Sequence, residues 1–106
     1  MGILTRIEEI ILLAVYHLDD RAYGSTVRQE VESMVGKSFS AGSIYVPLNR
    51  LAERGMLASN LSDPTPERGG RGKKFYTVTQ AGRDALRKAK ALQDAMWARM
   101  PSLEEL

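Results

Sequence analysis

The stretch SAGSIYVPLNRLAERGML, residues 40–57, has the pattern of a helix followed by the start of a strand. Three apolar residues recur at the spacing that places side chains on one helical face: Ile44, Leu48 and Leu51. Ser40 precedes them as a candidate N-cap, and Gly55 follows them as a glycine of the kind that ends helices. The stretch therefore predicts a helix from Ser40 to Gly55.

Two further helices are predicted before this stretch. Thr5 to Glu8 have the form of a capping box, and an apolar arc follows them until Asp19. The tripeptide Tyr-Gly-Ser that begins at Tyr23 opens a second helix, which Gly36 ends. We therefore expect three helices in the first half of the chain.

Two strands and a long helix are predicted after it. Residues 56–61 and 75–79 favour strands, and the turn-rich segment SDPTPERGGRGKK between them indicates a hairpin with a long basic loop. Thr79 is a candidate cap for a last helix, whose apolar stripe continues up to Pro101. With a rise of about 1.5 Å per residue this helix is ~30 Å long, too long to be buried against so small a core.

This order of elements is mainly α with a small β-hairpin, and it matches a winged helix-turn-helix followed by a long C-terminal helix. We expect residues 1–79 to form a DNA-binding domain and residues 80–106 to form a dimerisation helix and tail. In such a fold the third helix enters the major groove, and the hairpin contacts the neighbouring backbone or minor groove.

The composition argues against several other classes of protein. The 106 residues are 43% hydrophobic, enough for one modest core, and they include no cysteine and one histidine, His17. No nucleophile, base and orienting group stand at workable positions, so we expect neither an enzyme nor a metal or cofactor. The longest apolar run, residues 10–15, is far shorter than the ~20 residues of a membrane span, which favours a cytoplasmic protein.

Positive charge is concentrated in the middle of the chain. The net charge is only +2, yet residues 37–90 carry eleven bases and four acids, whereas residues 1–36 carry three bases and six acids. This distribution is the electrostatic footprint expected for a polyanionic partner.

Two groups of side chains are candidates for contact with DNA. The outer side of the third helix and its flanks carry groups that bind phosphates or base edges: Ser43, Tyr45, Asn49 and Arg50. The loop of the predicted hairpin adds bases suited to phosphate contact: Arg68, Arg71, Lys73 and Lys74. Each group alone also fits an ordinary solvated surface, but the two together favour DNA.

Pro47 lies inside the predicted third helix, where the missing N–H and the ring cost roughly 3 kcal/mol. With Ser40 as the cap, that N–H would have bonded to the carbonyl of Ser43, just after the first turn. Two interpretations are open. The defect either bends the first turn and sets the angle at which Ser43 and Tyr45 meet DNA, or only fits the helix over the core.

The last helix is the strongest candidate for a subunit interface. It carries a stripe of small and larger apolar residues at a spacing that lets two helices pack closely: Ala85, Ala89, Leu92 and Met96. Trp97 stands beside the stripe. Packing in a core or interface is its default role, and stacking on a bound ligand is the alternative.

Three segments in this order resemble the PadR family of bacterial and archaeal transcriptional regulators: AYGSTVRQEVE, SAGSIYVPLNRLAERGML and RGGRGKKFYTVTQAGRDAL. They resemble the family's Tyr-Gly helix start, its recognition-helix pattern and its wing-to-helix pattern, and the likeness covers nearly the whole chain. The sequence departs from the family's commonest form in one respect. Proline usually follows the tyrosine directly, whereas Val46 stands there and the proline is Pro47.

The resemblance implies a DNA-binding repressor that dimerises through its C-terminal helix, with the polar residues of the third helix and the wing bases at the DNA. Some similar regulators release DNA when a phenolic or multidrug ligand binds at the dimer interface, where Trp97 would play a part. A single helix after the wing is similar to the short-tailed branch of the family.

Two functions are therefore in view. The first is a homodimeric regulator that places two third helices in successive major grooves, about 34 Å apart, on a palindromic operator. The second keeps the fold but uses the exposed helix and loop to bind an acidic protein partner. Salt-sensitive binding to one duplex in preference to a scrambled one separates the two.

Overall fold

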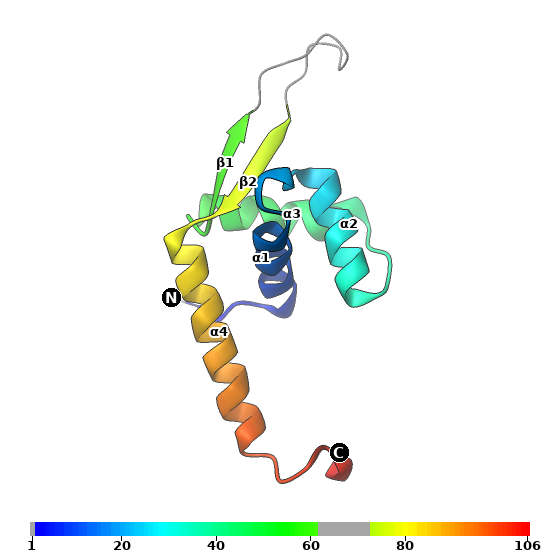
Figure 1. Cartoon of the computed structure of the whole chain (residues 1–106), viewed down its shortest axis with the longest axis vertical. Coiled ribbons are helices and arrows are strands. Elements are labelled where there is room, and N and C mark those ends of the chain that lie inside the picture. Colours follow the sequence, from blue (N-terminus) through cyan, green and yellow to red (C-terminus); the bar gives the residue numbers. More distant parts are fainter. Residues whose placement is uncertain (1, 62–72) are drawn as a thin grey trace.

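A computed structural model describes residues 2–61 and 73–106, and it confirms the predicted order of elements (Figure 1). The helices and strands are α1 (Arg6–Leu18), α2 (Gly24–Val35), α3 (Ala41–Glu53), β1 (Leu57–Leu61), β2 (Lys74–Val78) and α4 (Gln80–Ala98). Short 3₁₀ turns at Asp19–Arg21 and Leu103–Glu105 follow α1 and α4. The fold is a winged helix with a long C-terminal helix.

The predicted helix caps are confirmed. The side chain of Thr5 accepts the N–H of Glu8 at 3.2 Å, and the Glu8 carboxylate accepts the N–H of Thr5 at 2.8 Å, which closes the capping box of α1. At α3, Ser40 Oγ accepts the N–H of Ser43 at 3.2 Å. Gly36 ends α2 with a φ of 82°, a left-handed conformation that favours glycine.

The core lies where α1 meets α2, α3 and the hairpin, and α1 occupies its centre (Figure 1). The largest fully buried side chains come from three helices: Ile11, Leu12, Val15, Val27, Val31, Ile44, Leu48 and Leu51. The predicted inward face of α3 is therefore confirmed. The opposite side of α3 is exposed to solvent, next to the hairpin.

The hairpin is antiparallel, and it is also joined to the start of α2. Leu57 pairs with Val78 at one end of the ladder. On the other side of β2, the N–H of Tyr76 donates to the carbonyl of Ala22 at 2.8 Å. The observed strands differ by one residue at their ends from the predicted ranges, 56–61 and 75–79. β2 ends at Val78 because Thr79 is used as the cap of α4.

Thr79 fastens the start of α4 to the corner between α3 and β1. Its N–H donates to the carbonyl of Met56 at 3.1 Å, and its hydroxyl donates to the carbonyl of Gly55 at 2.6 Å. The same hydroxyl accepts the N–H of Gly82 at 3.1 Å. The direction in which α4 leaves the body is therefore set by backbone contacts at this corner.

Beyond this corner α4 extends away from the body (Figure 1), and Gly82 is the one residue of the helix that is buried. The expectation that it is too long for the core is confirmed. The prediction that it continues up to Pro101 is wrong, since the helix ends at Ala98. Proline disfavours helical backbone in the residue before it, and Met100 donates its N–H to the carbonyl of Trp97 in a tighter turn, at 3.0 Å.

Substitution of Gly82 tests the corner. A Cβ at this position would overlap the carbonyl oxygen of Met56 and lie 2.8 Å from Val78 Cγ1. We expect Gly82→Ala to lower the free energy of unfolding by about 1–3 kcal/mol, because the helix or the hairpin must shift. Urea denaturation followed by circular dichroism measures this change.

Gly42→Ala is the matched control, because Gly42 also lies in the first turn of a helix and a Cβ there meets nothing within 4 Å. We expect its effect to stay within about 1 kcal/mol. Equal destabilisation by the two substitutions would show that the overlap with the Met56 carbonyl is not what destabilises Gly82→Ala.

Candidate nucleic-acid interface

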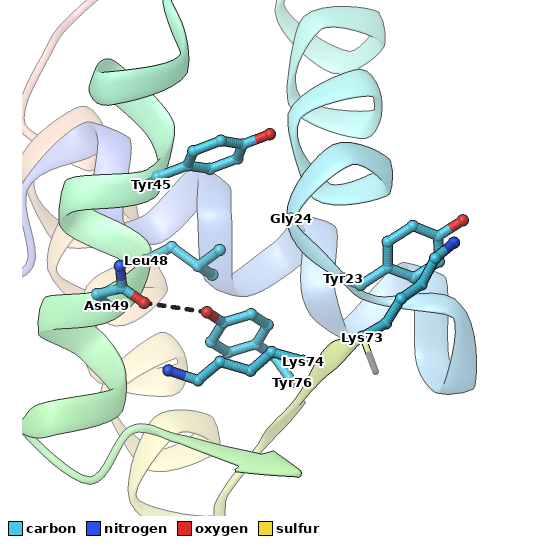
Figure 2. A pocket seen from close by; sticks show the side chains of 8 residues that line it. All are labelled: Tyr23, Gly24, Tyr45, Leu48, Asn49, Lys73, Lys74 and Tyr76. Carbon is cyan, nitrogen blue, oxygen red and sulfur yellow. Dashed lines mark hydrogen bonds between the residues drawn. The ribbon is translucent and has the colours of Figure 1, made fainter. Parts of the chain in front are cut away.

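A depression of about 360 Å³ lies between α3, the start of α2 and β2 (Figure 2). Its lining residues are Tyr23, Gly24, Tyr45, Leu48, Asn49, Lys73, Lys74 and Tyr76. Four of the residues predicted to contact DNA are among them: Tyr45, Asn49, Lys73 and Lys74. The third helix and the base of the wing, predicted as separate groups, thus share one surface.

Aromatic rings hold the two lysines of this surface. Lys73 Nζ lies 3.7 Å from the centroid of the Tyr23 ring, and Lys74 Nζ lies 5.7 Å from that of Tyr76. An ammonium group over an aromatic face is attracted by about 0.5–1 kcal/mol at exposed sites. The Tyr23 ring is itself packed edge-on against Phe75, with centroids 5.3 Å apart. The two positive charges therefore lie over rings that line the depression, Lys73 near the start of α2 and Lys74 over the ring that bonds to α3.

Asn49 is held by a hydrogen bond from the wing. The hydroxyl of Tyr76 donates to Asn49 Oδ1 at 3.0 Å, which joins β2 to α3 across 27 residues of sequence (Figure 2). Burial raises the pKa of Tyr76 above its usual value of 10.0. The hydroxyl therefore stays protonated at neutral pH and remains a donor.

Tyr45 lies on a flank of α3. The sequence predicts it on the outer side of this helix or its flanks, and in the structure its ring is half-buried and points toward the start of α2 (Figure 2). The ring packs so closely on Gly24 that a Cβ there would lie 3.4 Å from Tyr45 Cε1. The missing side chain at position 24 is what makes room for the ring.

The other two predicted DNA contacts of α3 do not line this depression. Ser43 and Arg50 are exposed on α3. The Ser43 hydroxyl is 2.6 Å from that of Ser40, so it takes part in the helix cap. Arg68 and Arg71 lie outside the described residues.

A second, mostly apolar groove of about 470 Å³ lies between α4 and the N-terminal segment. Ala85, Ala89 and Leu92 of the predicted subunit interface line it together with residues 2–4. Further along the helix, Met96 and Trp97 are 51% and 52% exposed. Ala85 packs partly against the core and Ala89 is half-buried, so the part of the predicted stripe that the chain leaves uncovered is its outer half, from Leu92 to Met96.

Sequence reasoning missed the roles of Tyr23 and Tyr76. Tyr23 was used only as a turn signal, although an aromatic residue at a helix start next to a predicted basic wing is a candidate platform for a cation. Tyr76 has a clearer signal, because strand alternation places it on the core side between Phe75 and Thr77. In residues 2–61 and 73–106 no group of acidic, histidine or cysteine side chains fits a metal ion, and no helix there is long and apolar enough to cross a membrane.

Solved structures share this fold. A PadR-like transcription factor from Bacteroides fragilis is 23% identical, with a TM-score of 0.72, and the match covers 85% of this chain and 82% of that one. A PadR family transcriptional regulator from Eggerthella lenta is 23% identical, with a TM-score of 0.71 and coverage of 87% and 75%. A PadR-like transcriptional regulator from Bacillus cereus is 22% identical, with a TM-score of 0.69 and coverage of 87% and 84%.

These structural likenesses establish the fold, and the match to a family model establishes the family. No curated protein matches the sequence. The model of the transcriptional regulator PadR-like family matches residues 12–88, which include α2, α3, both strands and the corner at Thr79. The chain therefore belongs to the PadR-like family of transcriptional regulators, a family of transcription factors and not of enzymes.

Proposed function

We propose that this protein binds a palindromic operator as a homodimer and acts as a repressor. The observation that carries the proposal is the shared depression, which Asn49 of α3 lines together with Lys73 and Lys74 at the start of β2. A base-reading amide and two phosphate-binding cations on one surface suit DNA, whose base edges and backbone lie side by side. We further propose that the protein acts in the cytoplasm.

In this proposal residues 1–79 form the DNA-binding domain. The outer side of α3 enters the major groove, where Asn49 and Arg50 reach base edges and Ser43 and Tyr45 reach phosphates. The bases of the wing contact the neighbouring backbone: Arg68, Arg71, Lys73 and Lys74.

Residues 80–106 supply the subunit interface. The uncovered stripe supports this part of the proposal. Exposing apolar side chains to water is unfavourable, and a second subunit that covers them removes this cost. A small aromatic effector would stack on Trp97 beside the stripe, since about half of the indole is exposed.

Removal of the two wing lysines tests DNA binding. We expect the wild type to bind the upstream region of its own gene more tightly than a scrambled duplex, and more weakly as salt rises. Lys73→Ala/Lys74→Ala should lower affinity for every duplex and reduce the salt slope by about two for each protomer, because two phosphate contacts are lost. Fluorescence anisotropy at several salt concentrations measures both quantities.

Arg87→Ala/Lys90→Ala is the matched control. It removes the same charge from exposed positions of α4, where Arg87 and Lys90 pair with Asp84 and Asp94. We expect the DNA affinity of this variant to depend on salt concentration with the same slope as that of the wild type. No binding of the wild type at low salt, to that region or to random duplexes, would leave an acidic protein partner as the explanation of this surface.

Pro47→Ala separates the two interpretations of the proline. Pro47 is half-buried in a helix that runs without interruption from Ala41 to Glu53. Alanine restores an N–H for the carbonyl of Ser43, so we expect stability to rise by up to about 3 kcal/mol. If the proline sets the docking angle, operator affinity falls despite this gain. Unchanged affinity would limit its role to fitting the helix over the core.

The subunit interface is tested with Leu92→Glu. Leu92 is 39% exposed in the single chain, and a carboxylate at this position would be buried without a partner in the dimer. We expect sedimentation equilibrium at micromolar concentration to show a dimer for the wild type and mostly monomer for the variant. Arg87→Ala, on the opposite side of α4, should remain dimeric. A monomeric wild type would contradict the interface.

A further inference from the structure

We propose that Tyr76 positions the Asn49 amide for base recognition, so that Asn49 reads a base through its NH₂ group alone. The inference rests on the proposed function, since it takes α3 to lie in the major groove. It goes beyond that function because it predicts which base edge Asn49 prefers and assigns the preference to a residue of the wing.

The geometry favours one orientation of the amide. Asn49 is exposed, and its Oδ1 accepts the hydroxyl of Tyr76 at 3.0 Å. In Figure 2 the oxygen faces Tyr76 and the nitrogen lies on the other side of the amide group. After a half-turn of the amide, its NH₂ group would face the hydroxyl, which would then have to accept the hydrogen bond. A phenol oxygen is a weaker acceptor than an amide oxygen because its lone pair is shared with the ring, so the orientation with Oδ1 toward Tyr76 is favoured.

Tyr76 itself has little freedom to move. Its side chain is 5% exposed, and its backbone N–H is bonded to the carbonyl of Ala22 at 2.8 Å. Its strand is paired with β1 on the other edge, and the ammonium of Lys74 lies over its ring. Because the backbone and ring of Tyr76 are held in this way, its hydroxyl is a donor at a fixed position, which is what a positioning residue needs.

The base preference follows from the donor that remains. Asparagine ordinarily recognises adenine with two bonds, donating to N7 and accepting from the N6 amino group. Here Oδ1 accepts the Tyr76 hydroxyl and is turned toward β2, which leaves the NH₂ group on the side that faces DNA. The major-groove edge of guanine offers two acceptors, N7 and O6, and no donor. We therefore expect guanine in preference to adenine at the base that Asn49 contacts.

Binding profiles over randomised duplexes test this inference. Asn49→Ala should remove the preference at one base pair of each half-site, which identifies the contacted pair. Tyr76→Phe should weaken the preference for guanine over adenine at that same pair by about tenfold, because the amide is free to turn. In the double variant, Tyr76→Phe should add nothing to the profile of Asn49→Ala.

Tyr23→Phe is the matched control. It also removes a phenol hydroxyl from the depression, but its ring lies under Lys73 on the side away from Asn49 (Figure 2). We expect its base profile to equal that of the wild type. The same loss of guanine preference in Tyr23→Phe and Tyr76→Phe would overturn the inference, because any lost hydroxyl would then have this effect.

Asn49→Asp gives a second readout that leaves Tyr76 intact. The carboxylate still accepts the hydroxyl but offers DNA only acceptors, so preference at the contacted pair should move from guanine toward cytosine, whose N4 amino group is a donor. Preference retained for guanine would overturn the inference.

Two other outcomes overturn the inference while the proposed function stands. An unchanged profile for Tyr76→Phe would show that the hydroxyl does not position Asn49. A uniform loss of affinity for all sequences in Asn49→Ala would place Asn49 on the DNA backbone. Failure of the wild type to select any duplex is the separate result that would remove the proposed function itself.

Discussion

Tyr76 joins three elements of the fold, and the arrangement of the proposed DNA-binding surface depends on it. Its backbone N–H bonds to Ala22, two residues before α2, its ring lies in the core, and its hydroxyl reaches Asn49 on α3. A two-stranded hairpin has marginal stability alone. In this protein the hairpin is anchored through the middle of β2, so the wing and α3 keep a fixed relation to one another.

The apolar residues divide the chain into a closed body and an open helix. Within the body, α1 supplies the largest buried group, and α2 and α3 cover it. On α4, one side presents the apolar stripe, and another carries pairs such as Arg87 with Asp84 at 3.1 Å and Lys90 with Asp94 at 2.8 Å. Exposed pairs of this kind contribute little stability but keep that side of the helix solvated. The asymmetry agrees with a helix that is buried on one side only.

The sequence predicted the elements well where their signals are local. Each helix cap involves residues within three positions of one another, and the spacing of Ile44, Leu48 and Leu51 alone identifies the inward face of α3. Contacts across the fold left no such signal. The bond between Tyr76 and Asn49 spans 27 residues, and the burial of Tyr45 depends on an absent side chain in another helix. The contacts of Arg68 and Arg71 remain predictions.

The corner at Thr79 connects the two proposed activities of the protein. Thr79 directly follows β2 and caps α4, and both of its bonds to the α3–β1 corner end on backbone carbonyls, which have less freedom than long side chains. The angle between the proposed DNA-binding surface and α4 is therefore set within a few residues. In the proposed dimer the two-fold axis doubles any change in this angle or in the packing of the two α4 helices, and the separation of the two α3 helices changes with it. Operator binding requires that separation to match one turn of DNA, about 34 Å. An effector that alters the packing around Trp97 would thus weaken DNA binding without contact to α3.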